Sequence, residues 1–178
     1  MNFKTGVATS LAVGCLASAA FASPNATDFR HQAMASDAFE IASSKIALGQ
    51  STNPQIDAFA KMMIHDHSLT TKHLLMGSGM TQADIDAKLA AGADGKHAAN
   101  DLVDQSHADM LDKLGSEKGK DFDSDYMSDQ VSGHKDAVSL FEDYAKNGDD
   151  RSLKSWARKT LPKLKMHLAR AKAIDAKM

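Results

Sequence analysis

Four ionisable residues stand out, because each falls on the inward face of a different predicted helix. They are Glu40, His67, His134 and His167. A neutral imidazole offers a borderline-soft nitrogen, and a set of three imidazoles with one carboxylate suits a single divalent transition metal. The carboxylate offsets part of the charge of the ion in a dry interior. The sequence therefore predicts that these four side chains bind one ion of zinc, iron, manganese or copper.

Other readings of the same region stay open. The four residues can also form a buried hydrogen-bond network that holds the core together without any metal. Asp37 and Asp66 lie to the side of the inward faces, where each could orient an imidazole from behind. His65 with Met62 could bind copper through imidazole and thioether, although methionines at helical spacing are usually packing residues.

The spacing of the apolar residues predicts the helices that position these groups. The expected helices cover residues 28–48, 54–76, 98–114, 121–146 and 151–176. Short turns join the first pair of long helices and the last pair, so the members of each pair should be antiparallel neighbours. Residues 80–97 add a further short helical stretch to the long connection between the pairs. The predicted fold is an all-α, antiparallel four-helix bundle with a long crossover that carries extra short helices.

The heights of the four ionisable residues within this bundle can be compared by counting from the turns. Glu40 lies about nine residues before the first turn and His67 about thirteen after it, at a rise of about 1.5 Å per residue. His134 lies about thirteen residues before the last turn and His167 about eighteen after it. Each pair is level within several ångströms, so the four side chains are expected to meet inside the bundle.

The first residues have the pattern of an export signal. Lys4 precedes an apolar run over residues 6–20, and Ala20-Phe21-Ala22 forms a small-residue cleavage pattern. We therefore expect residues 1–22 to be a signal peptide and residues 23–178 to form a single domain in the periplasm, or secreted. Lipidation at Cys15 is the alternative. Cleavage after Ala22 would remove the only cysteine and, with it, thiolate ligands and a cysteine nucleophile.

Charge and hydropathy argue against nucleic acid as a partner and against a membrane-spanning segment after the signal. A net charge of −2 over 178 residues gives no basic footprint for nucleic acid. No apolar run after the signal reaches the roughly 18–20 residues that span a bilayer. Nucleophile-elbow, phosphate-loop and zinc-protease motifs are absent from the sequence, so an enzymatic activity is left open rather than predicted.

Several short motifs carry a resemblance to a known family. In order they are Phe39-Glu40-Ile41, Ser44-Lys45-Ile46-Ala47-Leu48, Phe59-Ala60-Lys61-Met62-Met63-Ile64, Asp66-His67, Phe122-Asp123, Tyr126, His134, Leu161-Pro162-Lys163-Leu164 and His167. Together, over residues 28–174, they resemble an exported bacterial family of unknown function that is often labelled putative outer membrane protein. The resemblance implies a ferritin-like bundle and export, and it implies no established activity.

The chain departs from the di-iron pattern of the wider ferritin-like group, which has Glu-x-x-His on two helices. Ile64 and Leu164 stand three residues before His67 and His167, so too few carboxylates remain to balance two irons. The expected function is an exported bundle that binds one transition metal for redox protection or metal handling. The alternative is a metal-free envelope or stress protein that acts by binding partners. The sequence specifies no oligomeric state.

Overall fold

The computed structural model of the chain describes residues 25–79, 83 and 105–178, and these residues form five α-helices and no strand. The helices are α1 (Ala26–Gln50), α2 (Pro54–Met76), α4 (Gln105–Ser116), α5 (Gly119–Asn147) and α6 (Arg151–Asp175). The prediction of an all-α fold is confirmed. The expected signal peptide, Cys15 and, apart from residue 83, the short helical stretch in 80–97 lie outside the described residues, as does the first part of the helix expected over 98–114.

Side-chain caps explain where three of the helices begin. The side chain of Asn53 accepts a hydrogen bond from the backbone N–H of Gln55, and Pro54 occupies the first turn, where its missing N–H is not needed. The Asp150 side chain caps α6 in the same way, and Asn25 caps α1. The connections that join α1 to α2 and α5 to α6 are short.

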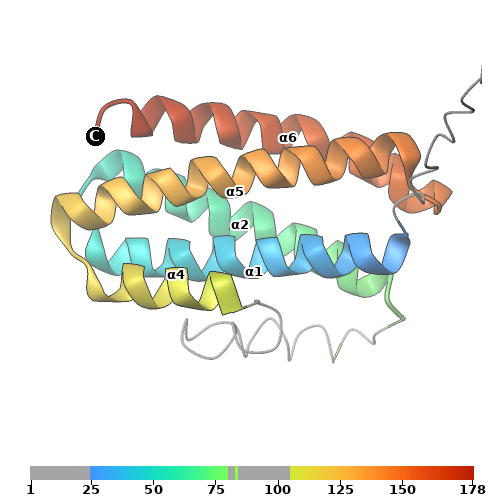
Figure 1. Cartoon of the computed structure of the whole chain (residues 1–178), viewed down its shortest axis with the longest axis horizontal. Helices are drawn as coiled ribbons and strands as arrows, with labels where there is room; N and C mark the ends of the chain where they lie inside the picture. The colour runs from blue at the N-terminus through green and yellow to red at the C-terminus, as the bar shows by residue number, and fades with distance from the viewer. Residues whose placement is uncertain (1–24, 80–82, 84–104) are drawn as a thin grey trace, which may run out of the picture.

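The four long helices lie lengthwise beside one another in two hairpins (Figure 1). In Figure 1, α2 runs back along α1, and α6 runs back along α5. The chain leaves α2 at one end of the molecule and starts α5 at the other end, and α4 lies along α1 in between. None of the described helices is long and apolar enough to cross a bilayer. The more specific assignment to a ferritin-like bundle stays a prediction.

The core has two apolar clusters separated by a polar layer. Toward the turn between α1 and α2, the first cluster contains Ala47, Ile56, Phe59, Met63, Phe122, Tyr126, Met127 and Ile174. Toward the turn between α5 and α6, the second contains Phe29, Leu74, Phe141, Tyr144, Leu153 and Leu164. On each long helix, the residues between the two clusters include buried polar side chains: Asp37, Glu40, Ser43, His67, Thr71, Gln130, His134 and His167. This layer contains all four of the predicted ligands.

Candidate metal centre

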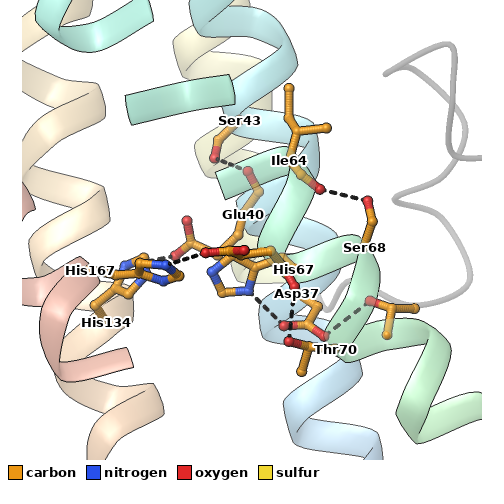
Figure 2. A network of polar contacts seen from close by, with 11 residues as sticks. Asp37, Glu40, Ser43, Ile64, His67, Ser68, Thr70, His134 and His167 are labelled. Carbon is orange, nitrogen blue, oxygen red and sulfur yellow. Dashed lines mark hydrogen bonds and ion pairs between the residues drawn. The ribbon is translucent and has the colours of Figure 1, made fainter. Parts of the chain in front are cut away.

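Three histidines from three helices face one another in the polar layer (Figure 2). His67, His134 and His167 each have one ring nitrogen that lies within 4.8 Å of a ring nitrogen of the other two, so that three nitrogens form a group. The ring centroids are 5.4–5.5 Å apart, and each residue is no more than 2% exposed. These three buried histidines could hold a metal ion. The counting argument, which placed them at one height, agrees with this geometry.

The first imidazole is fixed from behind by a buried carboxylate. His67 Nδ1 lies 2.7 Å from Asp37 Oδ1, and the other oxygen of Asp37 accepts a hydrogen bond of 3.0 Å from the Thr71 hydroxyl. Asp37 belongs to α1, whereas His67 and Thr71 belong to α2, so this contact also joins the first hairpin. Asp37 thus has the orienting position that the sequence suggested for it.

The second imidazole is fixed by a carboxylate that reaches the surface. His167 Nε2 lies 2.9 Å from Asp66 Oδ2, and Asp66 Oδ1 accepts a hydrogen bond of 2.9 Å from Lys163 Nζ. Lys163 stands one turn before His167 on α6, and Asp66 stands on α2. Asp66 was also suggested to orient an imidazole, and the imidazole that it contacts is that of His167. The link to Lys163 was not predicted from the sequence.

The third imidazole is held by its own helix. His134 Nδ1 lies 2.9 Å from the backbone carbonyl oxygen of Gln130, four residues earlier in α5. The Glu40 carboxylate is next to it, with Oε1 at 3.4 Å from the same nitrogen. The contact with Gln130 was not predicted from the sequence, where the spacing of four residues between Gln130 and His134 is the local signal for it.

These partners fix which ring nitrogen of each histidine carries the proton. A backbone carbonyl only accepts, so His134 Nδ1 donates and Nε2 keeps its lone pair. Asp66 is ionised and also accepts, so His167 Nε2 donates and Nδ1 keeps its lone pair. When Asp37 is ionised, His67 Nε2 is left with a lone pair in the same way. Each of these three nitrogens is buried without a hydrogen-bond partner among the described residues.

Burial keeps two of the imidazoles, those of His67 and His167, neutral. It lowers the pKa of His67 and of His167 to about 4, because an imidazolium would lose its hydration there. Burial also raises the pKa of the Asp37 carboxyl well above its usual range. For Asp66, burial works in the same direction, but hydrogen bonds from Lys163 and His167 outweigh it and lower the pKa. At neutral pH, His67 and His167 can therefore act as metal ligands without first losing a proton.

The fourth predicted ligand, Glu40, lies beside this group rather than in it. Its carboxylate is buried, and Oε2 has no hydrogen-bond partner among the described residues. Gly133 of α5 makes room for it, since a Cβ at that position would lie 3.0 Å from Glu40 Oε1. The structure thus brings Glu40 to within reach of the histidines, and its role as a ligand stays a prediction.

The remaining described histidines lie away from the centre. His31 and His65 are exposed, and His73 is exposed and stacks on Trp156 at 4.5 Å. His107 packs against Phe39 at 5.0 Å between ring centroids. The Met62 sulfur is 3.9 Å from a guanidinium nitrogen of Arg170. The exposed position of His65 makes the copper site suggested for His65 and Met62 much weaker than the buried cluster.

Fold and site together define an all-helical protein with a buried three-histidine centre. The chain belongs to the family described as "Domain of unknown function (DUF4142)", which matches residues 14–174. This agrees with the resemblance to a family that has no established activity. No curated protein and no solved structure matches the chain.

Proposed function

We propose that this protein binds one divalent transition-metal ion through His67 Nε2, His134 Nε2 and His167 Nδ1. The observation that carries the proposal is the convergence of three buried rings, each of which has one nitrogen already held and the other without a hydrogen-bond partner among the described residues. Metal-binding histidines have this arrangement, because the second nitrogen donates to a carboxylate or a backbone carbonyl that orients the ring. Asp37, Asp66 and the Gln130 carbonyl supply all three of these acceptors.

A cation fits this centre better than hydrogen bonding within it. When Asp37 is ionised, the unprotonated nitrogens of all three rings are acceptors, so they cannot satisfy each other. In a metal-free network, one ring would have to take up a second proton and donate it to the lone pair of a neighbouring ring. Burial opposes that solution, because it lowers the pKa of both His67 and His167 to about 4.

Glu40 is the proposed fourth ligand. Its free Oε2 and its position 3.4 Å from the His134 ring place a negative charge next to the centre. A carboxylate ligand would offset part of the ion's charge in an interior that holds little water. Three nitrogens and one carboxylate oxygen suit zinc, copper, iron or manganese, and the set contains no sulfur that would select a softer ion.

The enclosed position of the centre supports metal handling or redox protection rather than conversion of an organic substrate. All three histidines and Glu40 are buried between two apolar clusters. An ion or an electron can reach such a centre, whereas a larger substrate would have to displace the core. We further propose that the protein is an exported ferritin-like bundle. Its two hairpins and long connection support this fold, since such bundles build metal sites from side chains on facing helices.

Metal content tests the proposal directly. The protein, purified without a histidine tag and incubated with each metal in turn, is analysed by mass spectrometry beside a His67→Ala/His167→Ala variant. We expect close to one ion per chain, lost in the variant. His65→Ala is the matched control, since His65 is an exposed histidine on the same helix as His67. An absence of metal from every protein would contradict the proposal and favour a structural network in a protein that acts through partners.

A further inference from the structure

The hydrogen-bond partners of the centre differ in how far they extend toward solvent. Asp37 is buried, and so is Gln130. The Asp66 side chain is 12% exposed, and its partner Lys163 is 46% exposed. Among the described contacts of the three imidazoles, the one through Asp66 therefore leads from the centre to the surface.

We propose that metal ions enter and leave the centre between α2 and α6, past Asp66, and that the ion pair between Asp66 and Lys163 holds this route closed. The inference rests on the proposed metal binding and adds a path and a control point to it. Lys163 and His167 lie one turn apart on α6, and both contact Asp66 across the seam from α2.

The chemistry of Asp66 suits the first contact of an incoming cation. Its two oxygens point to different partners: Oδ1 to the Lys163 ammonium at 2.9 Å, and Oδ2 to the His167 ring at 2.9 Å. A cation that replaces the ammonium on Oδ1 is then held next to the ring that will bind it. The Lys163 side chain is 46% exposed, so its ammonium can leave Asp66 for water without unfolding the helices.

The other described surroundings of the centre are less suited to passage. The two apolar clusters close it above and below along the helix axes. On the α1 side, Asp37 and Glu40 are buried, and Phe39 of the same helix packs against α4 residues. Other contacts across the α2–α6 seam include the stacking of His73 on Trp156 at 4.5 Å and the weak approach of Arg170 to the Met62 sulfur at 3.9 Å.

The test compares Lys163→Met with Lys165→Met in the full-length protein. Lys165 is on the same helix and forms an exposed ion pair with Glu142 at 2.7 Å, so its loss changes the net charge equally without touching Asp66. Association of Co²⁺ is followed by stopped-flow absorbance, and release is followed after addition of excess chelator. We expect both rates to rise in Lys163→Met, by up to about fivefold, which corresponds to the loss of one exposed ion pair. The Lys165→Met rates should match those of the unmodified protein.

The outcomes separate this inference from the function on which it rests. Equal rates in the two lysine variants, with Co²⁺ bound by both, would overturn the proposed route and leave the metal centre standing. Faster association with slower release in Lys163→Met would also overturn it, since that pattern means a charge effect on the bound ion. Failure of the unmodified protein to bind Co²⁺ would remove the metal centre, and the route with it.

Discussion

Replacing Asp37 with asparagine distinguishes a metal ligand set from a structural network. Asparagine has the shape of aspartate, and its oxygen can still accept the hydrogen bond that His67 Nδ1 makes at 2.7 Å. Its amide nitrogen then faces the Thr71 hydroxyl, which can accept instead of donate. Asp37→Asn therefore preserves both hydrogen bonds and removes only the negative charge behind the ring.

The two roles predict opposite effects of this substitution. Losing an orienting carboxylate typically weakens metal binding 10–100-fold, which is about 1.4–2.7 kcal/mol of binding free energy. The stability of the metal-free protein should be unchanged or higher. Burial raises the pKa of Asp37, so the folded state holds its proton more tightly than the unfolded state does. The free energy of unfolding then falls as the pH rises through this range, and asparagine removes that penalty.

The assay needs two measurements on each protein. Competition with a chromophoric chelator gives the metal dissociation constant, and urea denaturation of the metal-free protein gives the free energy of unfolding. Asp57→Asn is the matched control. Asp57 is an exposed aspartate of α2 that pairs with Lys61 at 2.8 Å, so its loss should change stability by no more than about 0.5 kcal/mol and leave metal affinity unchanged.

One pattern of results would refute this reasoning. If Asp37→Asn left the metal affinity unchanged, whatever the stability of the metal-free protein, Asp37 would be a structural hydrogen-bond partner alone. The orienting role assigned to it would then be wrong.

Two further predictions concern the Glu40 side of the centre and its pH dependence. Gly133→Ala should weaken metal binding severalfold, because the new Cβ displaces the Glu40 carboxylate, which lies 3.0 Å from that position. Urea denaturation of the metal-free variant should show a stability that is equal or higher by up to about 1 kcal/mol, since alanine favours a helix. Because burial lowers the pKa of His67 and His167 to about 4, protons should compete with metal at these two rings only as the pH falls toward 4. Dissociation constants measured at pH 6.5 and 5.5 would contradict this if they showed the roughly fivefold loss per ring expected for an unshifted pKa near 6.5.

Local sequence signals were sufficient to predict most of the helical structure. Pro54 and its Asn53 cap determine the start of α2, and the inward stripe of α2 follows from strict helical spacing. That stripe places His67 four residues after buried Met63 and seven before buried Leu74. Since each turn fixes the height at which a helix begins, counting from the turns was enough to bring His67, His134 and His167 together.

The contacts that the sequence did not predict depend on packing in three dimensions. Helix α1 was expected to bury one ill-defined face, but it packs against α2, α5 and α4 and therefore buries residues around much of its circumference. Asp37 shares this environment with Ala35, Phe39 and Ala42. Periodicity cannot identify a partner on another helix, so neither the pairing of Asp37 with His67 nor that of Lys163 with Asp66 could be assigned from spacing alone.

The energetic cost of the polar layer is the strongest argument that it serves a purpose beyond folding. Three ring nitrogens and Glu40 Oε2 are buried without partners among the described residues, and each such group costs about 1–3 kcal/mol. Their sum is comparable to the total stability of a domain, which is about 5–15 kcal/mol. The clusters on either side show that these four helices can fill their interior with apolar side chains. A ligand that binds all of the unpartnered atoms would offset the cost at once, and a divalent cation has the charge and the preference for imidazole that this centre requires.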